Sequence, residues 1–233
     1  MTDFVLVPGA WLGAWAWKDV VPALEKEGHA AYPVTLTGMG ERVHLATKAV
    51  GMETAVRDVL NVMRYNEIDD PVLVGHSFAG KVVAAVADRA HDRVRRVVYV
   101  DAFRPDRVRA PQDGFDPTQE FGAVPSGEIG IPLTEEIVER IGKDVQGAAR
   151  RRMMALATPW PVKLASDPIT LSERYDAIRE AYVFCRRSGD PVDEIVAGKW
   201  GALFGPHTIL ESGHWPMITT PGELARDLVA LSR

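Results

Sequence analysis

The ten residues from Pro71 to Gly80 read PVLVGHSFAG and place a serine directly after an apolar run. The apolar run predicts a short buried strand over Val72 to Gly75, and the Ala- and Val-rich segment from Lys81 to Ala90 predicts a helix. A sharp turn between this strand and this helix would hold the hydroxyl of Ser77 above the end of a sheet. Such an arrangement is typical of a nucleophile elbow.

The residues around Ser77 meet the demands of a strained turn. Gly75 and Ala79 are small, although the second of these positions is more usually Gly. Because the helix begins just after Ser77, its unpaired N–H groups and the positive end of its dipole would face any anion that forms there. The alternative interpretation is an ordinary strand-to-helix turn with an incidental serine.

Apolar runs elsewhere in the chain predict further strands of a sheet buried on both faces. These runs cover residues 4–7, 30–35, 94–100, 181–185 and 207–210. Segments with helical periodicity lie between or after them, at residues 18–27, 52–65 and 221–231. The alternation predicts an α/β fold with a doubly wound, mostly parallel sheet of about six strands.

The segment from Arg104 to about Ser172 differs from the rest of the chain. It is rich in Pro and Gly, lacks strand patterns, and has helical periodicity over residues 135–141 and 144–156. We therefore expect residues 1–233 to form one domain, with residues 104–172 inserted as a helical cap after the strand that ends near Val100. Long insertions at the carboxyl ends of strands are often functional.

Composition narrows the classes of partner. The 233 residues carry a net charge of −5 without a basic block, which argues against nucleic acid as a partner. Cys185 is the one cysteine, so neither a disulfide nor a Cys-rich metal site is expected. No signal-peptide pattern or membrane-length apolar run is present. We expect a cytoplasmic protein that acts on a small molecule without membrane, metal or cofactor; its oligomeric state stays open, with a homodimer as one alternative.

A serine at an elbow needs a base, and His214 is the strongest candidate among the six histidines. It follows the last predicted strand, in a loop behind Ser212 and Gly213, well after Ser77 in the chain. A neutral imidazole there can accept the serine proton and return it to the leaving group. His76 is adjacent to Ser77, but its side chain should point away from the serine.

An acid should orient the imidazole, and three aspartates compete for this role. The usual chain order in such sites is serine, then acid, then histidine, and the loop after Cys185 offers two of the candidates. In this loop Asp190 is the first choice, because it closely follows the predicted strand, and Asp193 is the second. Asp101 is the rival, because it ends the strand that follows the elbow helix.

Four motifs together resemble the α/β-hydrolase superfamily, and in particular the group of plant methylesterases, hydroxynitrile lyases and bacterial esterase-like proteins. The motifs are PGAWLGAW at residues 8–15, LTGMGER at residues 36–42, GHSFAG at residues 75–80, and Gly213-His214. The resemblance extends over nearly the whole chain. It implies Ser77 as nucleophile, His214 as base, and an oxyanion hole made by the backbone N–H groups of Ala10 and Phe78.

The chain departs from this group at several positions. Pro8 and Leu12 stand where the family often has His, and Ser188 occupies the usual position of the acid. Trp215 follows the histidine where hydroxynitrile lyases of the group carry a lysine. This last difference argues against cyanohydrin cleavage.

The sequence thus predicts a serine hydrolase that cleaves a carboxylic ester of a small, largely apolar or aromatic acid through an acyl-enzyme. Trp11, Leu12 and Trp215 are the expected substrate-binding residues, because small-molecule pockets are lined mainly by such side chains. One alternative is a lyase or cyclase that acts on a polyketide-like or β-keto compound at the same site. A further alternative is a non-catalytic small-molecule receptor.

Overall fold

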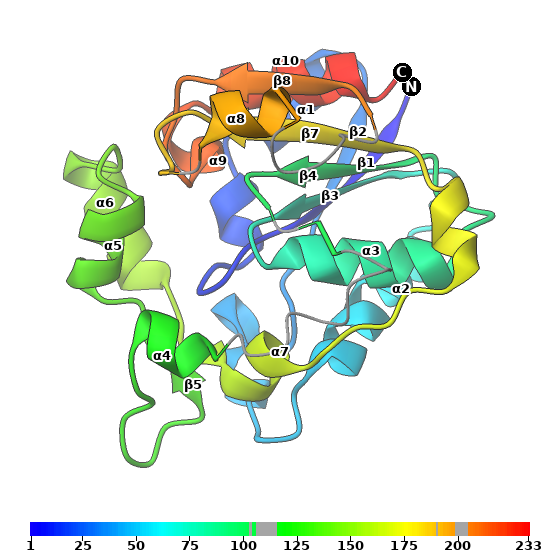
Figure 1. Cartoon of the computed structure of the whole chain (residues 1–233). Helices are drawn as coiled ribbons and strands as arrows, with labels where there is room; N and C mark the ends of the chain where they lie inside the picture. Colours follow the sequence, from blue (N-terminus) through cyan, green and yellow to red (C-terminus); the bar gives the residue numbers. More distant parts are fainter. Residues whose placement is uncertain (103, 106–115, 190, 199–204) are drawn as a thin grey trace.

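Six parallel strands form the central sheet (Figure 1). The computed structural model describes residues 1–102, 104–105, 116–189, 191–198 and 205–233. In spatial order the strands are β2 (Ala30–Pro33), β1 (Asp3–Val7), β3 (Val72–His76), β4 (Arg96–Val100), β7 (Glu180–Cys185) and β8 (His207–Leu210). All five neighbouring pairs are parallel, so the predicted sheet is confirmed.

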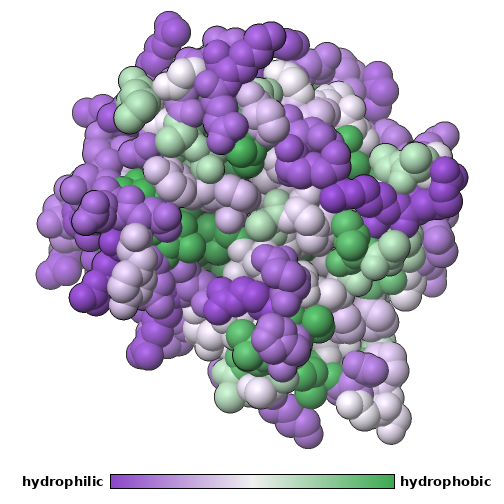
Figure 2. Space-filling view, turned by 180° about the vertical axis from the view of Figure 1, so that it is seen from behind, coloured by the Kyte–Doolittle hydropathy of each residue, from purple (hydrophilic) through white to green (hydrophobic). Residues whose placement is uncertain are grey.

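Helices cover both faces of the sheet, as expected for a doubly wound fold (Figure 1). On one face α2 (Met52–Tyr65) packs against α3 (Ala79–Arg89), and on the other α1 (Val21–Lys26) packs against α10 (Pro221–Leu231). In the part of the chain that the structure describes, no helix is both long and apolar enough to cross a membrane. Figure 2 shows hydrophilic residues around one face of the molecule, with residues of intermediate hydropathy and small groups of hydrophobic residues between them.

Prolines explain two differences between the predicted and observed elements. The helix expected from Lys18 begins at Val21, because Pro22 is best tolerated in the first helical turn. The strand expected to reach Thr35 ends at Pro33, which has no N–H group to donate to the sheet.

The described helices and strands of the cap segment, defined here as residues 104–172, begin at residue 117. These are α4 (Pro117–Phe121), β5 (Gly130–Ile131), α5 (Glu135–Ile141), α6 (Gly147–Leu156), β6 (Trp160–Pro161) and α7 (Val162–Ser166). Figure 1 shows α4, α5 and α6 beyond the carboxyl ends of the strands. The helix expected from Asp144 begins at Gly147, which leaves Asp144 in the connection between α5 and α6.

Close packing at the elbow makes Gly75 intolerant of any side chain. A Cβ atom at this position would lie 2.5 Å from Val83 Cγ2 and 2.8 Å from the carbonyl oxygen of Ala79. We expect Gly75→Ala to lower the free energy of unfolding by about 1–3 kcal/mol, measured by urea denaturation. Gly222→Ala in α10 is the matched control, since open space surrounds that position, and it should cause no loss. Equal stability of the two variants would contradict this account.

Candidate active site

Ser77 occupies a strained turn between β3 and α3. Its φ angle is 56°, in the left-handed region that residues other than glycine rarely adopt. The N–H of Ser77 donates to the carbonyl oxygen of Val100 at 3.2 Å, which ties the turn to the neighbouring strand β4. The turn therefore holds the hydroxyl at the carboxyl edge of the sheet, as the sequence predicts for an elbow.

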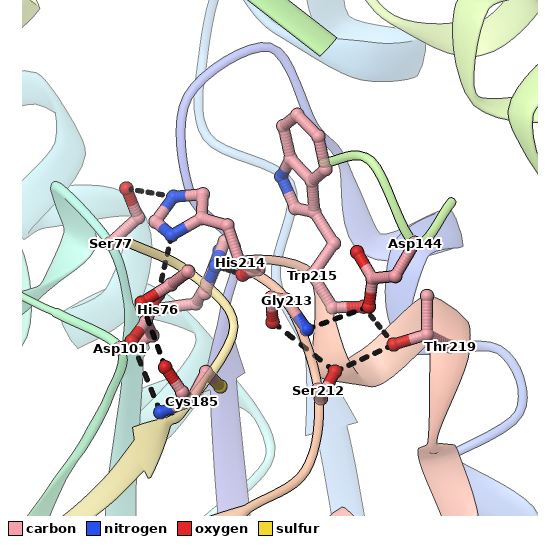
Figure 3. A network of polar contacts seen from close by, with 11 residues as sticks. His76, Ser77, Asp101, Asp144, Cys185, Ser212, Gly213, His214, Trp215 and Thr219 are labelled. Carbon is pink, nitrogen blue, oxygen red and sulfur yellow. Dashed lines mark hydrogen bonds and ion pairs between the residues drawn. The ribbon is translucent and has the colours of Figure 1, made fainter. Parts of the chain in front are cut away.

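The structure brings Ser77, His214 and Asp101 into one chain of hydrogen bonds (Figure 3). His214 Nε2 lies 3.0 Å from Ser77 Oγ, and His214 Nδ1 lies 2.7 Å from Asp101 Oδ2. Because an ionised carboxylate can only accept, Nδ1 carries the proton and Nε2 is left to accept from the serine hydroxyl. This is the tautomer that a general base requires.

Asp101 is held in place by two strands. It follows β4 with a φ angle of 43°, and its carboxylate is almost fully buried. Asp101 Oδ1 accepts a hydrogen bond from the backbone N–H of Cys185 at 3.2 Å, at the end of β7. Both carboxylate oxygens are therefore hydrogen-bonded, which offsets the cost of burying the group.

The other two candidate acids are Asp190 and Asp193. Asp190, the first choice of acid from the sequence, lies outside the described residues. The side chain of Asp193 is exposed and forms an ion pair with Arg186 at 2.7 Å. Asp101, the rival that the sequence kept open, is the carboxylate found at His214 Nδ1. Within the described ranges, no three or more His, Cys, Asp or Glu side chains are arranged to hold a metal ion.

The two residues expected to form the oxyanion hole both border Ser77. Ala10, in the loop after β1, and Phe78, directly after the serine, line the same pocket as Ser77 and His214. In the described part of the chain, neither backbone N–H donates to another protein group. These two N–H groups are thus available to a negatively charged oxygen near Ser77.

A narrow pocket opens on the serine and is lined largely by apolar side chains. Its empty volume is about 410 Å³, part of which is open to solvent. One side of the pocket is formed by residues at the edge of the sheet, namely Ala10, Trp11, Ser77, Phe78, Lys81 and His214. The other side is formed by the cap segment, through Phe121, Ile141, Trp160 and Ala165.

Of the three residues expected to bind substrate, Trp11 lines this pocket and the other two do not. Leu12 is fully buried in the core. Trp215 is also buried and packs against Gly142 in the cap segment, where any side chain at residue 142 would overlap the indole ring.

Sequence reasoning missed Lys81 as a pocket residue, although a signal was present. Lys81 follows Ser77 by four residues at the start of a helix, a spacing that places two residues on one face. Burial lowers the pKa of the Lys81 ammonium group below its ordinary value of 10.5. The cap residues gave no comparable signal, because they approach the serine only through tertiary packing.

His76 is fully buried, and its ring reaches the backbone of His214 rather than the hydroxyl of Ser77. Its Nε2 atom lies 2.6 Å from the carbonyl oxygen of His214, which can only accept, so Nε2 carries the proton. Burial, and secondarily the nearby His214, lower the pKa of His76 well below 6.5. The ring is therefore neutral in the folded protein.

Comparisons with known proteins agree with this fold. Residues 4–227 match the model of the alpha/beta hydrolase family. The carbendazim hydrolyzing esterase of Nocardioides sp. (strain SG-4G) is 48% identical over 106 residues, which are 46% of this chain but only 44% of that protein. Methylesterase 2 of Arabidopsis thaliana is 27% identical over 98% of this chain and 95% of its own.

Solved structures extend the agreement over the whole fold. An extracellular alpha/beta-hydrolase from a Paenibacillus species has a TM-score of 0.84 at 21% identity, over 100% of both chains. The chain therefore belongs to the alpha/beta hydrolase family. The resemblance to the group that contains plant methylesterases and bacterial esterases is confirmed.

The neutral state of His76 predicts a pH dependence of stability. In the unfolded chain this histidine binds a proton below about pH 6.5, whereas the folded protein resists protonation. The unfolded state thus binds more protons in this range, so the free energy of unfolding falls as the pH is lowered from 6.5 toward 5. The slope attributable to His76 reaches at most about 1.4 kcal/mol per pH unit.

Urea denaturation of the wild type and His76→Gln across this pH range measures the effect. Glutamine cannot take up the proton, so we expect a shallower loss of stability in the variant. Identical slopes for the two proteins would rule out His76 as the source.

Proposed function

We propose that this protein is a carboxylic ester hydrolase in which Ser77 is the nucleophile, His214 the general base and Asp101 the orienting acid. The observation that carries the proposal is the continuous hydrogen-bonded chain from Asp101 through His214 to Ser77, whose serine end opens into a pocket. The esterase and methylesterase names of the relatives support the same reaction class.

In the first half of the reaction, Ser77 Oγ attacks the carbonyl carbon of the ester while its proton passes to His214 Nε2. The negative charge that forms on the carbonyl oxygen is stabilised by the N–H groups of Ala10 and Phe78. Loss of one such donor costs about 3 kcal/mol of transition-state stabilisation in other enzymes. Collapse of the intermediate breaks the bond to the alcohol, which takes the proton from Nε2.

In the second half, water replaces the alcohol. His214 Nε2 takes a proton from the water as its oxygen attacks the carbonyl carbon of the acyl-enzyme. The bond to Ser77 Oγ then breaks, the proton returns to this oxygen, and the free acid leaves. Asp101 keeps the imidazole in the required tautomer throughout and accepts the hydrogen bond of the imidazolium that forms in each half.

The pocket supports a small substrate with an apolar or aromatic part. Trp11, Phe78, Phe121 and Trp160 place aromatic rings around the serine. Trp11 packs edge-to-face against two of the other rings. The distance between ring centroids is 5.3 Å to Phe121 and 5.8 Å to Trp160. Such rings offer flat apolar surfaces to a ligand. The names of the relatives suggest methyl esters and carbendazim as specific compounds to test.

The direct test is hydrolysis of p-nitrophenyl acetate and butyrate by the wild type and Ser77→Ala. We expect turnover by the wild type and a decrease of more than about 1,000-fold in kcat for the variant, because the nucleophile is lost. Treatment with a serine-directed phosphonate should add one covalent group to the wild type and none to Ser77→Ala, measured by mass spectrometry.

The alternatives lead to different outcomes of the same test. A folded wild type that turns over no ester above the Ser77→Ala background would overturn the proposal and direct attention to lyase or cyclase substrates. Tight ligand binding without any turnover would indicate a receptor.

The assignment of the acid has its own test. We expect Asp101→Asn to lower kcat by about 100- to 10,000-fold, because the amide can donate to Nδ1 and so favours the wrong imidazole tautomer. Asp193→Asn is the control, since the Asp193 carboxylate is exposed and pairs with Arg186, and it should retain wild-type activity. Asp190→Asn is the competing variant, and a larger loss there than in Asp101→Asn would reverse the assignment.

A further inference from the structure

Two side chains from distant parts of the chain hold the backbone on either side of His214 (Figure 3). The backbone N–H of Gly213 donates to Asp144 Oδ2 at 2.7 Å, and His76 Nε2 donates to the carbonyl oxygen of His214 at 2.6 Å. Asp144 belongs to the cap segment and His76 is the last residue of β3. The loop that carries the histidine is therefore held at the N–H of Gly213 and at the carbonyl oxygen of His214.

Glycines provide the space for both contacts. A side chain at Gly213 would overlap the carboxylate of Asp144. A Cβ atom at Gly9 would lie 2.5 Å from His76 Nδ1. Asp144 and His76 therefore occupy space that a side chain at residue 213 or residue 9 would otherwise fill.

Among the described residues, neither side chain finds a hydrogen-bond partner for its second polar atom. Asp144 Oδ1 and His76 Nδ1 are both buried and make no hydrogen bond to the described residues. A buried polar atom without a partner lowers stability. Each contact therefore fixes the loop at some cost in the free energy of unfolding, which points to a role other than stability alone.

The geometry of the His214 ring supplies such a purpose. The ring must reach Asp101 Oδ2 with one nitrogen and Ser77 Oγ with the other, and these partners lie at the ends of different strands. Both hydrogen bonds are directional and weaken steeply when misaligned. A shift of about 1 Å in a catalytic group can reduce turnover about 100-fold.

We propose that Asp144 and His76 are positioning residues that clamp the Gly213–His214 backbone and so keep the imidazole aligned with both Ser77 and Asp101. The inference rests on the proposed hydrolase function. It also connects the cap segment to the base, because Asp144 belongs to this segment and binds the loop of His214. Asp144 lies three residues after Ile141, which lines the pocket.

Neutral His76 suits this role. The imidazole of His214 becomes positively charged during each half of the reaction, and the centroids of the two rings are 4.8 Å apart. A second positive charge at this distance would oppose that protonation. Burial keeps His76 uncharged, so it donates a hydrogen bond to the base's backbone without repelling the imidazolium.

The first arm of the test compares Asp144→Ala with Asp144→Asn. Asparagine keeps an oxygen that can accept from Gly213 N–H, whereas alanine does not. We expect Asp144→Ala to lower kcat at least about 10-fold with KM changed less than about threefold, and Asp144→Asn to stay within about threefold of the wild type on both. Glu136→Ala, at an exposed position in α5, is the matched control in the cap segment and should behave as the wild type.

The second arm compares His76→Leu with His76→Gln in the same assay. Glutamine retains an N–H donor at similar reach, so we expect its kcat to exceed that of His76→Leu by about 10-fold. This pair tests the clamp independently if Asp144→Ala fails to fold. Circular dichroism and thermal unfolding establish that each variant is folded at the assay temperature.

A spectroscopic measurement separates the clamp from the proposed reaction. The proton shared between His214 Nδ1 and Asp101 should give a low-field NMR signal, because it lies in a short hydrogen bond to a carboxylate. We expect this signal to move upfield or disappear in Asp144→Ala and to persist in Asp144→Asn. The measurement needs no turnover, so it stands even if the protein hydrolyses no ester.

Two results would overturn the inference. One is a folded Asp144→Ala with wild-type kcat and an unchanged low-field signal. The other is equal loss in the alanine and asparagine variants, or in the leucine and glutamine variants, since the retained hydrogen-bonding atom would then have no effect.

Discussion

The left-handed turn at Ser77 is the constraint on which the rest of the site depends. A non-glycine residue in this conformation costs about 1–3 kcal/mol, and the surrounding structure must hold it in place. β3 supplies this support, because all five of its residues are buried and the strand is paired with β1 on one side and β4 on the other. Gly75 and Gly9 leave the space that the turn requires. The strained turn thus follows a buried strand paired on both sides, and it fixes the direction of the hydroxyl.

The parallel sheet then determines which residues can meet that hydroxyl. The carboxyl ends of β3, β4 and β8 lie at one edge, so the residues that follow these strands converge there. Asp101 and His214 are 113 residues apart in the chain and yet form a hydrogen bond. Since β4 and β7 are neighbours, Asp101 also reaches the backbone of Cys185, which anchors the carboxylate independently of the histidine.

The cap segment completes the site in two ways. Phe121, Trp160 and their neighbours form one wall of the pocket, which gives the serine an apolar surrounding. Asp144, between α5 and α6, reaches the loop that carries His214. The same segment therefore contacts both the pocket and the loop that carries His214.

The sequence by itself determined the parallel sheet, the elbow at Ser77 and the choice of His214, because each depends on a local pattern that survives without tertiary information. Apolar periodicity identifies strands and helices, and small residues around a serine identify a strained turn. Only the tertiary structure decided which carboxylate reaches His214 Nδ1 and which side chains line the pocket. Asp101 and Asp190 both lie between Ser77 and His214 in the chain, so the order of serine, acid and histidine fits either of them. Aromatic residues such as Trp215 have the same apolar character in a core as in a pocket, and only packing separates the two.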